Sequence, residues 1–202
     1  MKIYNCEQGT DEWLQVRLGK ITASNFGDVM AKGQGKIRRS YMIKLSAERL
    51  TGQPQDSYTN EYMEWGTLTE PIAREHYQQL YSKEIQQVGF VDLDSNIGCS
   101  PDGLIDADGL LEIKCPKTTT HLDNILNDKI QPCYMPQVQG QLWVTGRKWC
   151  DWISFDPRIK SQPMLVIRVY RDDAYIENLK KEVDLFVTEL NQMIEKFTKS
   201  EF

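Results

Sequence analysis

Apolar residues along the chain follow two spacings, and the alternating one is clearest at residues 103–115. Two short apolar runs, Gly103–Ile105 and Leu110–Cys115, flank the polar segment Asp106-Ala107-Asp108-Gly109. Asp-Gly between apolar runs is typical of a β-hairpin. The pattern therefore predicts two antiparallel strands joined by a turn centred near Ala107.

This predicted hairpin gathers charged side chains. A short turn sets Asp102 roughly opposite Glu112, and side chains alternate faces along a strand, so Glu112 and Lys114 share a face while Ile113 points into the core. Two neighbouring carboxylates repel each other unless a proton or a cation lies between them. Oxygen ligands suit Mg²⁺, and a lysine beside the ion can orient water or take its proton, with its pKa lowered by the cation. The alternative is that Glu-x-Lys has no catalytic role and lies on a solvated sheet edge.

The other spacings predict a mixed α/β chain. Helical periodicity and capping residues indicate helices over 11–18, 26–30, 40–50, 61–81, 132–145 and 174–199. In the 61–81 helix we expect an inward face formed by Trp65, Leu68, Ile72, Ala73, His76 and Leu80, with Pro71 as a kink or a break. Further strands are predicted over 87–93, 149–155 and 164–170, and a polar connector over 117–129. The expected architecture is a mixed central sheet with helices on both sides.

Composition narrows the class of protein. A chain of 202 residues, 40% hydrophobic and 26% charged, is most simply one globular domain over residues 1–202. No long apolar run or signal segment is present, so we expect a cytoplasmic protein. The five cysteines include no Cys-x-x-Cys pair and there are only two histidines. Zinc and iron–sulfur sites are therefore not indicated.

The net charge of −5 argues against a protein that coats DNA indiscriminately, but not against a locally basic DNA path. Residues 32–39 contain Lys32, Lys36, Arg38 and Arg39 and no acidic residue, so this run is either a phosphate-contacting segment or a solvated loop. Gln137 and Gln141 lie one helical turn apart, where their amides would be able to touch DNA.

Several motifs together resemble one nuclease superfamily. Ser-Pro-Asp-Gly-Leu at 100–104 and Leu-Glu-Ile-Lys-Cys-Pro at 111–116 are similar to the Pro-Asp…(Asp/Glu)-x-Lys nucleases, within which the chain resembles the lambda-type phage alkaline exonucleases, the YqaJ-like viral recombinase nucleases. Further matches, in the family's order, are Trp13…Arg17-Leu18-Gly19…Ile21-Thr22-Ala23-Ser24, Trp65-Gly66…Glu70, Tyr134-Met135…Gln137-Val138-Gln139, Trp143-Val144-Thr145 and Phe155-Asp156-Pro157-Arg158. The resemblance implies a restriction-endonuclease-like fold.

The resemblance also implies roles for individual residues. In the catalytic set, Asp102, Glu112 and the backbone carbonyl of Ile113 hold Mg²⁺, two ions during catalysis or Mn²⁺ in its place, while Lys114 acts on water and Glu70 supports the site. The DNA contacts that the resemblance implies are Ser100 beside the scissile phosphate, Arg17, Ser24 and Gln137 on the terminal 5′-phosphate, and Met63 as a wedge between parting strands. From the residues alone, Ser24 is equally a helix cap, Glu70 a solvated helix carboxylate and Tyr134 a packing aromatic.

One position departs from the family. The family's minor-groove arginine falls at Gln34; either Lys36, Arg38 or Arg39 replaces it, or the protein tracks DNA differently.

The activity implied is a Mg²⁺-dependent 5′-to-3′ exonuclease acting on double-stranded DNA ends, as a homotrimeric ring with a phage single-strand annealing protein as partner in the host bacterial cytoplasm. The alternatives are a structure-specific endonuclease or helicase-associated repair nuclease on the same fold, and a non-catalytic DNA-end-binding subunit.

Overall fold

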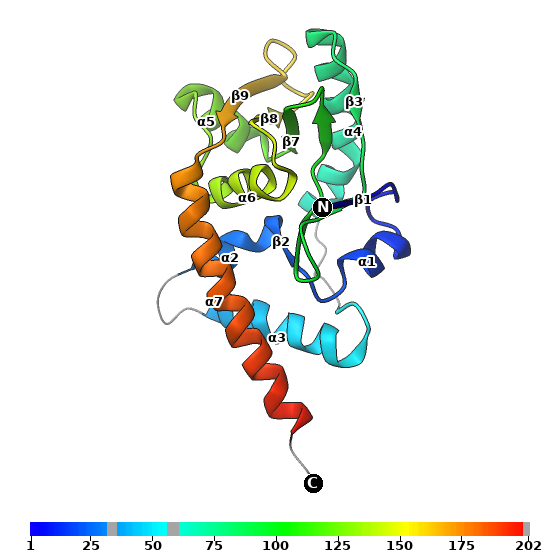
Figure 1. Cartoon of the computed structure of the whole chain (residues 1–202). Coiled ribbons are helices and arrows are strands. Elements are labelled where there is room, and N and C mark those ends of the chain that lie inside the picture. The colour runs from blue at the N-terminus through cyan, green and yellow to red at the C-terminus, as the bar shows by residue number, and fades with distance from the viewer. Residues whose placement is uncertain (32–35, 56–60, 200–202) are drawn as a thin grey trace.

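The computed structural model describes residues 1–31, 36–55 and 61–199 (Figure 1). The helices are α1 (Asp11–Arg17), α2 (Phe26–Met30), α3 (Lys36–Thr51), α4 (Glu61–Tyr81), α5 (Thr118–Asn127), α6 (Met135–Thr145) and α7 (Asp173–Thr198), with 3₁₀ turns over Ala23–Asn25 and Pro132–Tyr134. The strands are β1 (Lys2–Tyr4), β2 (Ile21–Thr22), β3 (Ile85–Gln86), β4 (Phe90–Asp92), β5 (Ile97–Cys99), β6 (Gly103–Ile105), β7 (Gly109–Lys114), β8 (Trp149–Phe155) and β9 (Met164–Tyr170). Among these described helices, none is long and apolar enough to cross a membrane.

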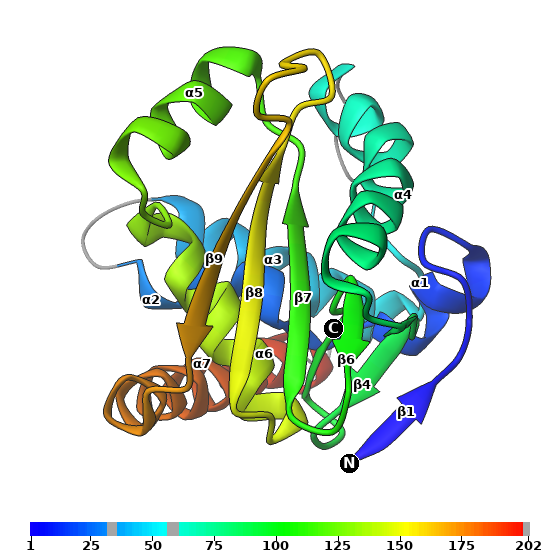
Figure 2. The same ribbon diagram turned by 90° about the horizontal axis from the view of Figure 1, so that it is seen from above.

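The strands form two mixed sheets. The larger has the order β3-β6-β7-β8-β9, in which β7 and β8 are parallel and the other neighbours antiparallel. The smaller has the order β1-β4-β5-β2. Helix α6 contacts strands of both sheets, and Figure 2 shows α4 and α5 on either side of the larger sheet, with α6 and α7 beneath it. The predicted mixed α/β architecture is confirmed.

The two faces of the larger sheet pack into different cores. On one face Leu110 and Trp152 join a core with helices α2, α3, α6 and α7. On the other face Leu111 and Ile153 pack with Ala73 and Tyr77 of α4. Because side chains alternate along β7, Glu112 and Lys114 lie on the face of Leu110 and are directed toward α6.

The predicted hairpin is confirmed at its centre. Gly103 is paired with Leu111 and Ile105 with Gly109, so Asp102 comes one step further along, opposite Glu112. Asp106 adopts φ +46°, a left-handed conformation that Asp tolerates better than most residues. Ile113 packs into the α4-side core, as expected.

The predicted connector over 117–129 is wrong, because residues Thr118–Asn127 form helix α5. Its buried face is polar: His121 Nδ1 and Asn124 Nδ2 lie 2.8 and 3.0 Å from the hydroxyl oxygen of Ser154 in β8. Hydrogen bonds rather than an apolar stripe hold this helix against the sheet, so a hydrophobic pattern did not reveal it.

The predicted strand over 87–93 is present in shorter form, as β4 over Phe90–Asp92. The preceding strand β3, over Ile85–Gln86, belongs to the other sheet. The chain crosses at Gly89, where an added Cβ would lie 2.3 Å from the Cys6 carbonyl oxygen, so a side chain would not fit. Strands β1, β2, β3 and β5 were not predicted.

The helices match in extent better than in orientation. Helix α4 has the predicted bounds and continues through Pro71. Its predicted inward face is wrong at Leu68, Ile72 and Leu80, which are 74%, 53% and 61% exposed. Ala73 is buried as predicted, together with Thr69 and Tyr77. Helix α3 begins at Lys36 instead of residue 40, and residues 132–134 form a 3₁₀ turn before α6.

Candidate active site

The centre of the site is the carboxylate of Glu112, whose residue is only 1% exposed. Gln137 Nε2 donates to Oε1 and Gln141 Nε2 donates to Oε2, each at 2.7 Å. Lys114 Nζ lies 2.6 Å from Oε1 and 3.2 Å from the side-chain oxygen of Gln137. The expected pairing of Glu112 with Lys114 on one face is therefore present, and the two glutamines of α6 meet it there.

Asp102 is held beside Glu112 by the strand that follows the hairpin turn. Its Oδ2 accepts a hydrogen bond from the backbone N–H of Ile113 at 2.6 Å. Burial, together with the charges of Glu112 and Glu70, raises the pKa of Asp102 well above its ordinary 3.8, although Lys114 and the Ile113 N–H act in the opposite direction. A cation beside Asp102 therefore favours its ionised form.

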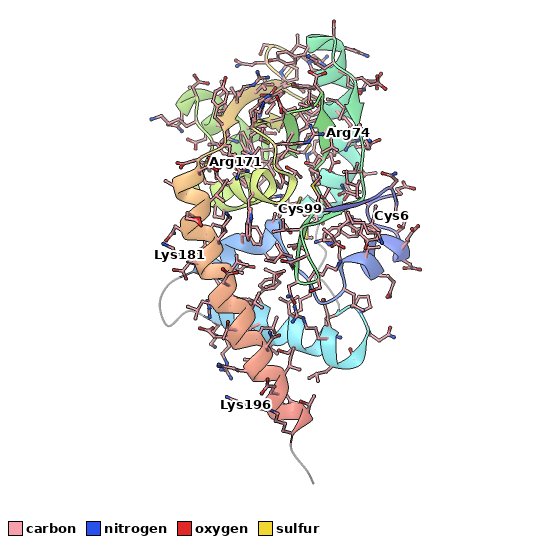
Figure 3. The ribbon with its side chains drawn as sticks, in the orientation of Figure 1. Cys6, Arg74, Cys99, Arg171, Lys181 and Lys196 are labelled. Carbon is pink, nitrogen blue, oxygen red and sulfur yellow. The ribbon has the colours of Figure 1, made fainter. Side chains whose placement is uncertain are left out.

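Glu70 and Arg74 bring α4 into the site. Arg74 donates to Glu70 one turn earlier on the helix, and its Nε donates to the Asp102 backbone oxygen at 3.1 Å. Figure 3 shows Arg74 projecting from α4 toward the strands. Burial raises the pKa of Glu70, and the charge of Glu112 adds to this, against the lowering influence of Arg74. Glu70 thus lies within electrostatic reach of the site, in contrast to a solvated helix carboxylate.

The lowered pKa predicted for Lys114 depends on a metal cation beside it, and in the protein alone the neighbouring carboxylates act in the opposite direction. Burial alone lowers the pKa of its ammonium, but the charges of Glu112 and Asp102 outweigh burial and raise it above the ordinary 10.5. Its ammonium occupies the position of a cation between two carboxylates. An ion placed there would remove the attraction that raises this pKa.

The donor set fits a hard metal ion. Asp102, Glu112 and the carbonyl of Ile113 offer oxygen ligands, and the mutual repulsion of the site's acids is relieved by a divalent cation. Within the described parts of the chain, no three His, Cys, Asp or Glu side chains gather closely enough to hold an ion on their own. Mg²⁺ usually binds one or two carboxylates and keeps several waters, so this partial shell suits an ion completed by water and substrate phosphate.

A second cluster joins α1 to the residues before the hairpin. The indole Nε1 of Trp13 donates to Ser100 Oγ at 2.9 Å and to the Gly89 carbonyl at 3.0 Å. The guanidinium of Arg17 lies 3.8 Å from the centre of the Trp13 ring, and burial lowers the pKa of Arg17 to about 10. In the part of the chain that the structure describes, no acceptor is hydrogen-bonded to this guanidinium. It is a desolvated cation with its donors available.

The remaining predicted residues lie around these clusters. Ser24 is exposed and hydrogen-bonds Thr22 and Asn25; neither Thr22 nor Asn25 caps the following helix with its side chain, so the capping interpretation is wrong for this stretch. Met63, on the first turn of α4, is 49% exposed. Gln34 lies outside the described residues.

The candidate replacements for Gln34 are all on α3. Arg38 donates to the Val29 carbonyl at 3.1 Å and pairs with Glu189 of α7, so its guanidinium is tied to the fold. Lys36 and Arg39 are exposed. Tyr134 packs against Trp152 with ring centres 5.5 Å apart, which agrees with its interpretation as a packing aromatic.

Sequence reasoning missed three contributors to the site: Arg74, Trp13 as a donor to Ser100, and Gln141 as a donor to Glu112. The sequence did contain a signal for Arg74: it lies four residues after Glu70, and side chains at this spacing are neighbours on a helix. The bond from Trp13 had no signal, since 87 residues separate Trp13 from Ser100.

Solved structures of known proteins share this fold. An alkaline exonuclease from Laribacter hongkongensis has the same fold, with a TM-score of 0.89 and 41% identity over 94% of this chain and 97% of that one, and its complex with dAMP matches equally well. A phage-related exonuclease from Haemophilus somnus 129PT shares the fold alone, with a TM-score of 0.71 and 14% identity over 91% of this chain and 99% of that chain. The YqaJ-like viral recombinase domain model matches residues 12–148.

The fold defines the class of protein: a nuclease-type domain with the restriction-endonuclease-like fold. Within that class the chain is a homologue of an alkaline exonuclease. It belongs to the YqaJ-like viral recombinase family.

Proposed function

We propose that this protein is a Mg²⁺-dependent 5′-to-3′ exonuclease that digests one strand of linear double-stranded DNA. The 3′ single-stranded overhangs it leaves would serve phage recombination by strand annealing. One observation carries the proposal: Asp102, Glu112 and Lys114 converge on one sheet face in a fold shared at 41% identity with an alkaline exonuclease. That relative's structure in complex with dAMP supports a nucleotide as the group bound.

The residues of the site divide the hydrolytic work. Asp102, Glu112 and the Ile113 carbonyl would hold Mg²⁺, with a second ion during cleavage and Mn²⁺ as a substitute. The bound metal supplies electrophilic assistance at the scissile phosphate. Lys114, hydrogen-bonded to Gln137 and paired with Glu112, would orient the attacking water, and it would accept a proton from that water only where the bound ion has lowered the pKa that the carboxylates raise. Glu70, anchored by Arg74, keeps additional negative charge beside the site.

The terminal phosphate has a separate place in this proposal. Arg17 offers a desolvated guanidinium with available donors, and guanidinium groups bind phosphate bidentately. Ser24 and Gln137 would complete its contacts, and Ser100, fixed by Trp13, would contact the phosphate beside the scissile bond. Capture of the new 5′ end after each step would favour continued digestion of the same strand.

Assembly and partners are part of the proposal. Leu68, Ile72 and Leu80 leave an apolar stripe of α4 in water, which supports burial between subunits of a homotrimeric ring. Met63 would act as the wedge between parting strands. Membership of a viral recombinase family supports an annealing protein as partner and work in the host bacterial cytoplasm.

The decisive experiment is digestion of a linear duplex labelled separately at its 5′ and 3′ ends, with and without chelator. We expect ion-dependent release of the 5′ label as mononucleotide while the 3′ label stays on a long strand. Early release of the 3′ label would contradict the polarity. Rapid cutting of closed circular duplex would instead support an endonuclease on the same fold.

A further inference from the structure

Two glutamines of α6 bind the same carboxylate in different surroundings. Gln137 and Gln141 are one helical turn apart, and each donates to one oxygen of Glu112 at 2.7 Å. The bond to Oε2 from Gln141 is buried, with Gln141 only 1% exposed. The bond to Oε1 from Gln137 is part-buried, and Lys114 shares that oxygen. The two oxygens are therefore unequal: Oε1 is on the side that Lys114 shares, and Oε2 is enclosed.

The orientation of the Gln141 amide leaves one of its polar atoms without a hydrogen bond. Among the described residues, its side-chain oxygen is buried and has no hydrogen-bond partner. Turning the amide over would give that oxygen no relief, because it would then face the carboxylate of Glu112. A glutamine present only to fill the core would be expected to satisfy both ends of its amide. The unpaired oxygen indicates that the donor bond to Glu112 determines the orientation.

Strand β8 covers the side of Glu112 on which Oε2 lies. Trp152, the neighbour of Glu112 across the β7–β8 pair, is completely buried. The bond to Oε2 is therefore on the more deeply buried side, whereas Gln137 and Lys114 are more exposed and are the groups that an ion at Oε1 would displace.

We infer that Gln141 is a positioning residue: it locks Glu112 so that Oε1 alone is presented as the metal-ligand oxygen, and Gln137 is the exchangeable partner released on ion binding. This inference rests on the proposed metal-dependent function. It adds that Gln137 and Gln141, although chemically identical, have different roles. Residues that orient a metal ligand through a hydrogen bond contribute strongly to metal affinity without touching the ion.

The test measures ion binding without DNA, so activity does not enter. Mn²⁺ is titrated into the full chain and the free ion is followed by electron paramagnetic resonance. Gln141→Met, which keeps the volume and removes the donor, should weaken Mn²⁺ binding by about 10–100-fold. The matched control Gln137→Met, one turn away on the same carboxylate, should lose no affinity because it removes only a group the ion displaces. Melting curves without ion check that each variant is folded.

Two further variants make the outcomes separable. Glu112→Gln should weaken Mn²⁺ binding, and adding Gln141→Met to it should cause no further loss, because the orienting bond has lost its carboxylate. If wild type binds no Mn²⁺, or Glu112→Gln binds it unchanged, the proposed metal site fails and this inference with it. If Glu112→Gln loses affinity while Gln141→Met does not, or if Gln137→Met loses as much, only this inference is overturned. Gln141→Asn, whose amide is withdrawn by one methylene, replaces Gln141→Met if the latter does not fold; two unfolded variants would assign Gln141 to folding and overturn the inference.

Discussion

Arg17 offers the sharpest test of how the protein would recognise a DNA end. Its guanidinium is stacked on Trp13, 3.8 Å from the ring centre, and no acceptor among the described residues satisfies it. Replacing Arg17 with Ala removes the charge and its donors, while Trp13 keeps its own bonds to Ser100 and Gly89. Replacing Arg17 with Lys keeps a charge but loses the bidentate geometry.

The magnitude follows from the desolvation of the guanidinium. Burial lowers the pKa of Arg17 from 12.5 to about 10, which corresponds to about 3 kcal/mol lost by the charged form. A phosphate that pairs with the guanidinium recovers part of this cost, and hydrogen bonds to charged groups contribute about 1.5–3 kcal/mol. The preference of wild type for a 5′-phosphate over a 5′-hydroxyl end should therefore be about 10–150-fold. Arg17→Ala should abolish this preference, and Arg17→Lys should retain part of it.

The assay compares initial digestion rates on two duplexes that differ only in the 5′ group. Lys148→Ala is a matched control, because Lys148 is a largely exposed cation paired with Asp108 beside the hairpin turn. Its ratio of rates should equal that of wild type. Equal wild-type rates on both ends, or an unchanged ratio in Arg17→Ala, would refute the assignment of Arg17 to the terminal phosphate.

Three other predictions follow from the same geometry. Asp102→Asn can still accept the Ile113 N–H but loses a charged ligand, so cleavage should fall at least about 100-fold while a gel-shift assay finds DNA-end binding retained. Trp13→Phe removes the donor to Ser100, so the cleavage rate should fall more than end binding does; equal losses in the two assays would argue against this. Burial favours the neutral form of Asp156, yet hydrogen bonds from Arg158 and Thr118 lower its pKa from 3.8 to about 2. Ionised Asp156 therefore stabilises the fold above about pH 4, and this stabilisation disappears as the pH falls toward 2. Asp156→Asn should cost about 2 kcal/mol in urea unfolding at pH 7 and progressively less toward pH 3, and a constant difference across that range would contradict the argument.

The local elements could be predicted because their signals lie within short segments. The Asp-Gly turn between apolar runs specified the β6–β7 hairpin, and the helical spacing after Asp173 specified α7. Once the hairpin register is set, the positions of Asp102, Glu112 and Lys114 follow from the alternation of strand side chains. The placement of these three side chains was therefore available from the sequence.

Which face of a helix packs against the rest of the protein could not be predicted from such local signals. Helix α4 was predicted with its bounds correct and Ala73 buried, but Leu68 and Ile72 were expected to face inward, whereas the structure exposes both and buries Thr69 and Tyr77. Hydrophobicity alone does not distinguish an apolar face that packs in the core from one left at the surface. Helix α5 was missed for the opposite reason, since its buried face is made of His121 and Asn124.

What the sequence determined by itself is the set of charged groups: an acidic pair, a lysine and an arginine, with the strand and helix types that carry them. Only the tertiary structure decided which hydrogen bonds hold these groups in place. Examples are the bonds from Trp13 to Ser100, from Arg74 to the Asp102 carbonyl and from Gln141 to Glu112. The physical reason is that strand alternation and helical period are properties of neighbouring residues. A hydrogen bond between residues 28 to 87 positions apart exists only after the sheets and α6 have packed against each other.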